Sequence, residues 1–378
     1  MIVVQLKGPP TGTFDESCLA VGSPIGQRRR DICRGVPPVK LLWTPNSNSI
    51  EFCRQTATVE RKDKVINGLV TRDDVVAAAK RIAGAVRRTP LLESEIRGTR
   101  IWLKCECLQT GGSFKLRGAS NRLLQLSEEE RERGVVAFSS GNHARGVALA
   151  ARRIGISATI VMPADAPAVK VEGTRGEGAE IVFFNRRTES REKIAARIAG
   201  ETGATVVPSF DDVHIVAGQG TVGLEIVEQL GRPPARIVVP CGGGGLTAGI
   251  ALGAPDSEIV AVEPDGWDDM GRSLEQGEIV PVEPGAPNTF CDAIMTPKVS
   301  PITFAILREH QAKSASVSDT EVEDALRFAW EKHQLVVEPG AAVGLAAVLA
   351  GKLEPVEDTV IVVSGGNIDP ALHARIIG

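Results

Sequence analysis

The chain has 378 residues, a formal net charge of −4, 43% hydrophobic residues and 24% charged residues. These values are ordinary for a soluble globular protein, and the length predicts two domains. The charge excludes the strongly basic surface with which many proteins bind nucleic acid or anionic membranes. No apolar run approaches the roughly 18 residues of a membrane span, and the first residues lack the pattern of a secretory signal.

Seven cysteines are scattered along the chain, at positions 18, 33, 53, 105, 107, 241 and 291. Cys105 and Cys107 lie two residues apart in a strand-like stretch and so share one face, which does not give the C-x-x-C geometry of a zinc or redox site. Free thiols in a reducing compartment are the simpler interpretation, so we expect a cytoplasmic protein.

The first 65 residues differ from the rest of the sequence. They contain prolines at positions 9, 10, 24, 37, 38 and 45, an arginine triplet at 28–30, and no sustained helical or strand period. We therefore expect residues 1–65 to form an N-terminal extension that packs poorly. A start codon assigned too far upstream would also account for this segment.

Regular structure is expected to begin at Thr71, which can cap a helix together with Asp74 three residues later. Beyond it, short β-branched runs alternate with amphipathic helical segments. This alternation predicts an α/β fold, in which helices cover both faces of a parallel sheet. The strand-like runs are residues 135–138, 158–162, 180–184, 205–210 and 236–240, and the segments EIVAVEP and TVIVVSGG.

Polar, glycine-rich motifs lie at the ends of several of these strands: SSGNH, CGGGG, EPDGWDD and SGGN. In parallel sheets ligands bind beyond the carboxyl ends of the strands. Because several strand ends carry motifs of one chemical character, the sequence predicts an enzyme site there.

The glycine run at 242–245 lies between a strand and a helix. Backbone amides without side chains can curl around a phosphate, and the start of the following helix adds positive potential. A tight turn is the alternative. The run matches neither the nucleotide triphosphatase loop nor the dinucleotide-binding pattern.

Lys115 lies between Phe114 and Leu116, which is unusual for a surface charge. Its amine would have a lowered pKa in an apolar pocket and would be able to form an imine. The alternative is a lysine that extends its amine to solvent from a helix.

Taken together, the segments GSFKLRGA, SSGNHARG, AGQGTVGLEI, CGGGGL, VEPDGWDD, VEPGAAV and SGGN resemble the pyridoxal-phosphate enzymes of fold type II. The chain most resembles the serine/threonine dehydratases and serine racemases, from about residue 70 to 378. The resemblance implies parallel-rich twisted sheets flanked by helices, as in the tryptophan synthase β fold. It also implies a large cofactor-binding domain of residues 66–133 and 212–378, and a small domain of residues 134–211.

The resemblance further implies which residues bind pyridoxal phosphate. Lys115 would be the Schiff-base lysine and the general base, and Phe114 would lie against the cofactor ring. Asn142 would bind the 3-oxygen, and Ser364 would face the pyridine nitrogen. A neutral hydroxyl at that nitrogen weakens the ring as an electron sink, which suits the prompt departure of a leaving group. The remaining implied cofactor contacts are Gly242, Gly243, Gly244, Gly245 and Glu338.

For the substrate, the resemblance implies contacts from the SSGNH loop and from the TESREK segment. These residues are Ser139, Ser140, Asn142, His143 and Arg191. Ser140 matches the second catalytic residue of serine racemases, but many dehydratases have a similar loop, in which this serine caps a turn. Arg191 would alternatively be a solvated helix residue. Phe210 resembles the bulky residue of the dehydratases.

A metal site is implied at EPDGWDD, where Glu263, the carbonyl of Trp267 and Asp269 would hold Mg²⁺ or Ca²⁺. Carboxylate and carbonyl oxygens are the ligands that these cations prefer. A solvated acidic turn is the alternative.

We therefore expect a dehydratase that converts threonine or serine to a 2-oxo acid and ammonia, acting as a homodimer or homotetramer. A serine racemase with dehydratase side activity, a hydroxyaspartate dehydratase and a non-catalytic sensor remain alternatives. We expect no regulatory domain after SGGNIDP, and therefore a catabolic role. Two departures bear on substrate choice: Gly111 replaces a threonine of the family pattern, and Arg145 stands where glutamine is commoner.

Overall fold

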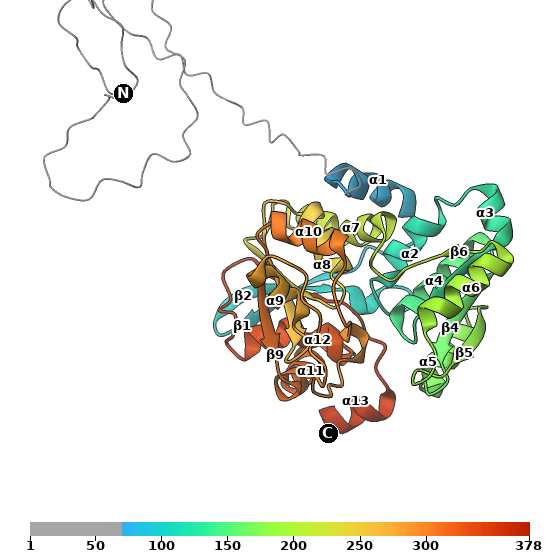
Figure 1. Cartoon of the computed structure of the whole chain (residues 1–378). Helices are drawn as coiled ribbons and strands as arrows, with labels where there is room; N and C mark the ends of the chain where they lie inside the picture. Colours follow the sequence, from blue (N-terminus) through green and yellow to red (C-terminus); the bar gives the residue numbers. More distant parts are fainter. Residues whose placement is uncertain (1–69) are drawn as a thin grey trace, which may run out of the picture. The chain divides into compact units, whose positions relative to one another are not determined.

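The computed structural model describes residues 70–378 (Figure 1). The extension expected at residues 1–65 lies outside the described residues. The helices are α1 Arg72–Ile82, α2 Lys115–Leu123, α3 Glu128–Arg133, α4 Asn142–Ile154, α5 Ala168–Arg175, α6 Arg191–Thr202, α7 Val213–Leu230, α8 Gly245–Gly253, α9 Asp269–Gln276, α10 Pro301–Glu309, α11 Asp319–His333, α12 Pro339–Leu349 and α13 Pro370–Ile377. Two short 3₁₀ helices are η1 Glu106–Leu108 and η2 Asp292–Ile294.

The strands form two separate sheets. The six-stranded sheet has the order β1-β2-β10-β7-β8-β9, and the four-stranded sheet has the order β5-β4-β3-β6. All neighbouring strands are parallel except β1 and β2, which are antiparallel. The strands are β1 Leu91–Ile96, β2 Thr99–Cys105, β3 Val135–Phe138, β4 Ala158–Pro163, β5 Glu180–Phe184, β6 Thr205–Val206, β7 Arg236–Pro240, β8 Glu258–Pro264, β9 Lys313–Val317 and β10 Thr359–Val363.

The first helix begins where the sequence predicts. The Thr71 side chain accepts a hydrogen bond from the amide of Asp74 at 3.3 Å, and the Thr71 amide donates to the Asp74 carboxylate at 2.9 Å. Two amides that have no partner within the helix are thereby satisfied. The capping box expected at this position is confirmed.

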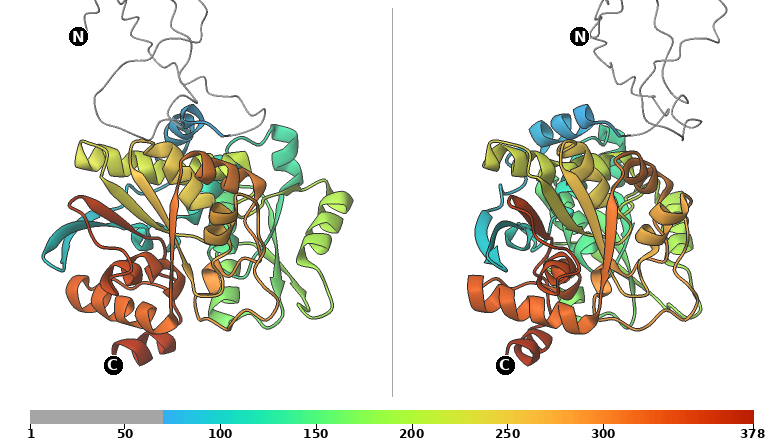
Figure 2. Two further views of the ribbon diagram at one scale, coloured as in Figure 1. Left: turned by 60° about the vertical axis from the view of Figure 1, so that its left-hand side comes forward. Right: turned by 90° about the vertical axis from the view of Figure 1, so that its left-hand side faces the viewer.

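Helices cover both faces of the six-stranded sheet (Figure 2). In β8, Val260 and Val262 pack in one apolar core with α11 and α12, whereas Ile259 and Ala261 pack in another with α7 and α8. Because successive side chains of a strand point to opposite faces, a strand buried on both faces is apolar throughout. This explains the uninterrupted apolar run in EIVAVEP.

The four-stranded sheet is also covered on both faces. Val135 and Ala137 of β3 pack with α2 and α4, and Val136 packs against Ala195 of α6. The last strand is shorter than the predicted run 205–210: β6 ends at Val206, although the next amide still donates to the carbonyl of Val136 at 2.9 Å. Pro208 has no amide hydrogen and cannot continue the ladder.

Helix α2 contacts both the core of the four-stranded sheet and helix α7. Its residues Leu116, Ala119 and Leu123 belong to the core of the four-stranded sheet. Its Asn121 donates to the carbonyl of His214 in α7, at 2.6 Å. The division into residues 66–133 with 212–378 and residues 134–211 remains a proposal. No helix among the described residues is long and apolar enough to cross a membrane.

Candidate functional site

Each of the four polar motifs lies at the carboxyl end of a strand: SSGNH after β3, CGGGG after β7, EPDGWDD at the end of β8 and SGGN after β10. The segment before α2 is paired with the last of these motifs. The Phe114 amide donates to the Ser364 carbonyl at 3.2 Å, and the Gly366 amide donates to the Gly112 carbonyl at 2.8 Å. The segment that carries Lys115 is therefore fixed against the end of β10.

Lys115 is the first residue of α2, and its side chain is half-buried. Its Nζ atom donates to the backbone carbonyl of Ser209 at 3.0 Å and lies 5.2 Å from the centre of the Phe114 ring. Burial lowers the pKa of Lys115 to about 8, and the nearby Glu338 opposes this shift. The amine is thus directed into the protein, and its neutral form is well populated under mildly alkaline conditions.

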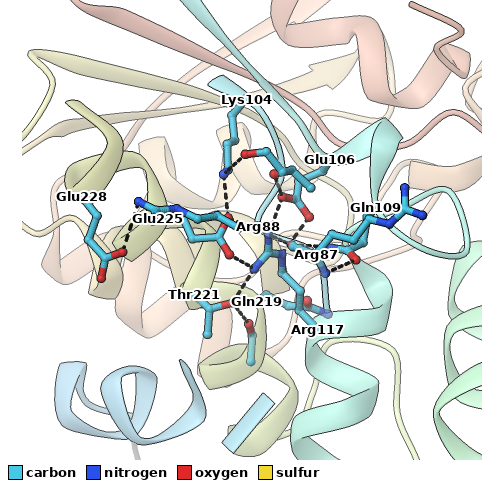
Figure 3. A network of polar contacts seen from close by, with 12 residues as sticks. Arg87, Arg88, Lys104, Glu106, Gln109, Arg117, Gln219, Thr221, Glu225 and Glu228 are labelled. Atoms are coloured by element: carbon cyan, nitrogen blue, oxygen red, sulfur yellow. Dashed lines mark hydrogen bonds and ion pairs between the residues drawn. The ribbon is translucent and has the colours of Figure 1, made fainter. Parts of the chain in front are cut away.

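A buried ionic network holds the other side of α2 (Figure 3). Arg117 donates to both carboxylate oxygens of Glu106, at 2.7 and 2.8 Å, and to both oxygens of Glu225, at 2.7 and 2.9 Å. Lys104 donates to Glu225 at 2.6 Å and to the Thr89 carbonyl at 3.0 Å. Two cations therefore balance two carboxylates, as a buried charge requires.

The pKa values of the two cations shift in opposite directions. Burial lowers the pKa of Arg117, but Glu106 and Glu225 raise it more, so that it lies above the usual value. Burial lowers the pKa of Lys104, which Glu225 partly opposes. The sequence alone does not identify the network, because Glu225 is more than 100 residues away from both Lys104 and Glu106.

The side chain of Asn142, at the start of α4, lies between two polar partners. Its Nδ2 atom donates to Glu338, and its Oδ1 atom accepts from Asn367 at 2.7 Å. Glu338 is buried, and burial raises its pKa to about 7 although the bond from Asn142 lowers it. Asn367 was not identified as a site residue from the sequence, although it is the last residue of the SGGN motif.

The glycine run connects β7 to the first turn of α8. Among the described residues, no backbone carbonyl accepts a hydrogen bond from the amides of Gly242, Gly243 or Gly245. A Cβ atom at Gly243 would overlap the Phe210 ring, so only glycine fits there. Thr247, in the first turn of α8, is fully buried, and its hydroxyl has no hydrogen-bond partner among the described residues. Free amides, a free hydroxyl and a helix N-terminus together suit a phosphate group.

Glu263 in β8 and Asp269 at the start of α9 are buried, so the solvated-surface interpretation is wrong for these two carboxylates, although Asp265 in the turn between them is exposed. Glu263 accepts from the amides of Met270 at 3.0 Å and Gly271 at 2.9 Å, at the start of α9. Asp269 Oδ2 has no hydrogen-bond partner among the described residues. Burial, together with Asp269, raises the pKa of Glu263 well above its usual value, and burial raises the pKa of Asp269 to about 7. Within residues 70–378, no group of three or more His, Cys, Asp or Glu side chains forms a metal site.

A cavity of about 250 Å³ lies at the carboxyl end of the four-stranded sheet. Its lining includes Ser139 and Ser140 of the SSGNH loop and the two arginines Arg186 and Arg191. The guanidinium of Arg191 lies 5.5 Å from the centre of the Phe138 ring and bonds to Glu192 at 2.8 Å. The structure therefore brings Arg191 and the SSGNH loop to one cavity.

His143 is buried, and its Nε2 atom lies 2.9 Å from the Val207 carbonyl. Because a carbonyl only accepts hydrogen bonds, Nε2 carries the proton and Nδ1 is an acceptor. Nδ1 has no partner among the described residues. Burial lowers the pKa of His143 to about 3, so the ring is neutral and supplies no positive charge for a substrate carboxylate.

One of the cysteine expectations needs correction. Cys105 ends β2 as expected, but Cys107 lies in the 3₁₀ helix η1, so the two do not continue one strand. The intervening Glu106 turns inward to bind Arg117, which ends the strand. Cys105, Cys107, Cys241 and Cys291 are all buried free thiols.

Comparison with known proteins identifies the family. Residues 82–365 match the family described as pyridoxal-phosphate dependent enzyme, and the chain belongs to it. The cofactor that the family implies is therefore pyridoxal phosphate.

Three relatives indicate which kinds of enzyme within the family the chain is similar to. The chain is 43% identical to L-threo-3-hydroxyaspartate ammonia-lyase of Saccharomyces cerevisiae, over 81% of this chain and 96% of the relative. It is 42% identical to L-threonine ammonia-lyase of Thermotoga maritima, over 82% of this chain and 78% of the relative. The solved structure of maize serine racemase matches with a TM-score of 0.77 and 38% identity, covering 81% of this chain and 96% of the other. The resemblance to fold type II enzymes and the α/β fold class are confirmed, and the chain lies among ammonia-lyases and racemases.

Proposed function

We propose that the protein is an ammonia-lyase that removes the β-hydroxyl group and the amino group of a small L-amino acid. The candidates are serine, threonine and 3-hydroxyaspartate, and the products are a 2-oxo acid and ammonia. The observation that carries the proposal is the amine of Lys115, directed into the protein beside Ser209, with a pKa lowered to about 8 by burial. The similarity to two ammonia-lyases supports the choice of elimination.

The residues around Lys115 fit pyridoxal phosphate. Lys115 would bind it covalently, and Phe114 would lie against its ring. The free amides of the glycine run and the Thr247 hydroxyl would hold the phosphate. Asn142 and Glu338, which are bonded to each other, would lie at the 3-oxygen side, and Ser364 would face the ring nitrogen. When bound, the cofactor withdraws electrons from the α-carbon of the substrate and so makes the α-proton acidic.

The protein's own groups would then position the substrate and move its protons. Ser139, Asn142 and the amides at the start of α4 would bind the substrate carboxylate, because that helix N-terminus favours an anion. The neutral His143 would support this loop through its bond to Val207. Lys115 Nζ would accept the α-proton, since a base with a pKa near the working pH is efficient. The β-hydroxyl would take up a proton, which the newly protonated Lys115 Nζ can return, and leave as water. A second water would then replace the amino group, which gives the 2-oxo acid and ammonia.

Racemisation is the second candidate function. It is favoured by Ser140, which lines the cavity with Ser139 and Arg191 and whose side chain makes no hydrogen bond among the described residues. The similarity to serine racemase supports it as well. Phe210 argues against racemisation: its ring packs on Gly243, and it resembles the bulky residue of the dehydratases.

A divalent cation would fit the turn after β8. We propose Mg²⁺ or Ca²⁺ held by Glu263, the carbonyl of Trp267 and Asp269. Burial raises the pKa values of both carboxylates, Arg272 only partly opposes the shift at Asp269, and one oxygen of Asp269 has no hydrogen-bond partner among the described residues. Oxygen ligands of this kind suit a hard cation. The cation would stabilise the turn; no part in the reaction is assigned to it.

We propose a cytoplasmic homodimer or homotetramer. The four buried thiols are compatible with a reducing compartment. Size-exclusion chromatography with light scattering would give the oligomeric state.

The test is to incubate the purified protein with pyridoxal phosphate, Mg²⁺ and, separately, L-serine, L-threonine and L-threo-3-hydroxyaspartate. Keto acid, ammonia and D-serine are measured in one time course. We expect keto acid and ammonia in equal amounts, and neither from a Lys115→Ala variant. D-serine formed as fast as pyruvate would make racemisation the main activity. If no substrate yields either product, the proposed function is wrong, and a non-catalytic sensor becomes the better hypothesis.

A further inference from the structure

Arg145 lies on α4, three residues after Asn142, so the two side chains emerge from the same face of the helix. They are also joined through Asn367. Arg145 Nη1 donates to Asn367 Oδ1 at 3.1 Å, and Asn367 Nδ2 donates to Asn142 Oδ1 at 2.7 Å. A guanidinium is therefore held at the edge of the site that the proposed function gives to the substrate.

Not all N–H groups of this guanidinium are hydrogen-bonded to the described residues. Its Nε atom is buried and faces Glu177 beyond hydrogen-bond distance, whereas no described residue accepts a hydrogen bond from its Nη2 atom. Within the described part of the chain, Glu177 is the one carboxylate within 4 Å of it, at 3.6 Å, and Glu177 lies closer to Arg152, at 2.8 Å. Two arginines share one carboxylate, so the region carries a net positive charge.

The turn opposite Arg145 leaves this face of α4 open. Gly111 has a positive φ of 81°, which side chains disfavour, and its carbonyl accepts from Asn367 at 2.9 Å. A Cβ atom at Gly111 would lie 3.3 Å from Leu149, which is four residues after Arg145 on the same face. A larger residue at position 111 would therefore crowd the face that carries the guanidinium. The two departures from the family pattern, at 111 and 145, thus lie against the same helix face.

We propose that Arg145 is a specificity residue that binds a second carboxylate of the substrate, so that the preferred substrate is a β-hydroxy amino acid with a carboxylate on its β-carbon. The inference rests on the proposed function. A guanidinium pairs with a carboxylate through parallel hydrogen bonds, which serine and threonine cannot accept because their β-carbon carries hydrogen or methyl. Arg145 is 39% exposed in its side chain, so water can replace that carboxylate when it is missing. The preference is therefore moderate, about tenfold, and not absolute.

Binding without elimination gives the first test. L-aspartate and L-alanine carry no β-hydroxyl, and they differ by the second carboxylate. Titration of the holoenzyme with each, followed by the absorbance of the cofactor, gives two dissociation constants. We expect aspartate to bind about tenfold more tightly than alanine, and Arg145→Gln to remove this difference. Arg145→Lys, which keeps the charge without the fork, should retain part of it.

Arg152→Gln is the matched control, because it removes the same charge from the same helix and from the same partner, Glu177. We expect it to keep the preference for aspartate. If Arg152→Gln and Arg145→Gln reduce the preference equally, general electrostatic attraction explains it, and the assignment of Arg145 is overturned.

Turnover gives the second test. Arg145→Gln should lower the ratio of kcat/KM for L-threo-3-hydroxyaspartate to that for L-serine by about tenfold. An equal fall for both substrates would show a general structural role and overturn the inference, while leaving the lyase function intact. Turnover of none of the substrates would refute the proposed function instead, and the aspartate titration would still decide the role of Arg145.

Discussion

Replacement of Arg117 by methionine tests whether the buried network fixes α2. In the wild type, Glu106 receives two hydrogen bonds from Arg117, whereas Glu225 is also bonded to Lys104 at 2.6 Å. After the replacement Glu225 keeps a cation and Glu106 does not, although Thr89 still donates to Glu106 at 2.5 Å. One buried carboxylate without a cation is expected to lower the free energy of unfolding by about 3–5 kcal/mol.

The assay is thermal unfolding of the cofactor-free protein, followed by far-ultraviolet circular dichroism. For roughly 300 ordered residues the entropy of unfolding is about 0.6 kcal/mol per degree, so the midpoint should fall by about 5–8 °C. Arg117→Met combined with Glu106→Gln removes the uncompensated charge and should recover at least about 2 kcal/mol. The double variant also preserves the apolar contacts of α2, so it isolates the charge.

Two results would contradict this reasoning. A loss below about 1 kcal/mol for Arg117→Met would show that Glu106 finds another partner or takes up a proton at little cost. Additive losses in the double variant would show that packing of the guanidinium, and not charge balance, is the main contribution.

Three further outcomes are expected. The rate at which the cofactor-free protein takes up pyridoxal phosphate is measured by the absorbance of the bound cofactor. It should rise with pH and level off above about pH 8, because burial lowers the pKa of Lys115 to about 8 and only the neutral amine forms the bond. A rate that does not change between about pH 6 and about pH 9 would contradict this. Gly243→Ala should weaken cofactor binding by at least about tenfold in a fluorescence titration, because a Cβ atom there would overlap the Phe210 ring. Gly155→Ala, at an exposed helix end, is the control and should not weaken binding. Millimolar Mg²⁺ or Ca²⁺ should raise the unfolding midpoint of the wild type but not that of Asp269→Asn, because the carboxylate that lacks a hydrogen-bond partner would hold the cation; an equal rise in both would place the cation elsewhere.

The sequence predicted most of the strands that are buried on both faces. The run at 236–240 matches β7, and EIVAVEP matches β8, because such strands are apolar throughout. The strands near the edges of the large sheet were not identified. In β9, Lys313 and Ser314 are exposed, and β1 contains two glutamates, so neither has a continuous apolar run. Charged side chains on edge strands prevent unwanted pairing, and they also hide the strand from a search for apolar runs.

The candidate site was predictable where a motif is continuous in the chain. The glycine run, the SSGNH loop and Lys115 are each local, and their chemistry follows from residue type. The partners of these motifs are not local: Ser209 approaches Lys115 from 94 positions away, and Asn367 approaches Asn142 from 225 positions away. Only the fold brings such pairs together. A signal for the ionic network was present, since Lys104 and Glu106 are charged residues within a buried stretch and require partners.

The double attachment of α2 limits how the enzyme can open. Through Arg117 the helix is fixed to α7, and through Leu116 and Ala119 it is fixed to α4. The backbone of α4 approaches closely at Gly146, where a Cβ atom would lie 3.2 Å from the carbonyl carbon of Lys115. A hinge between the two sheets would have to break one of these attachments. We therefore expect substrate entry to depend on movement of the outer part of the four-stranded sheet, around β5 and α6, while Lys115 and the start of α4 stay together throughout the catalytic cycle.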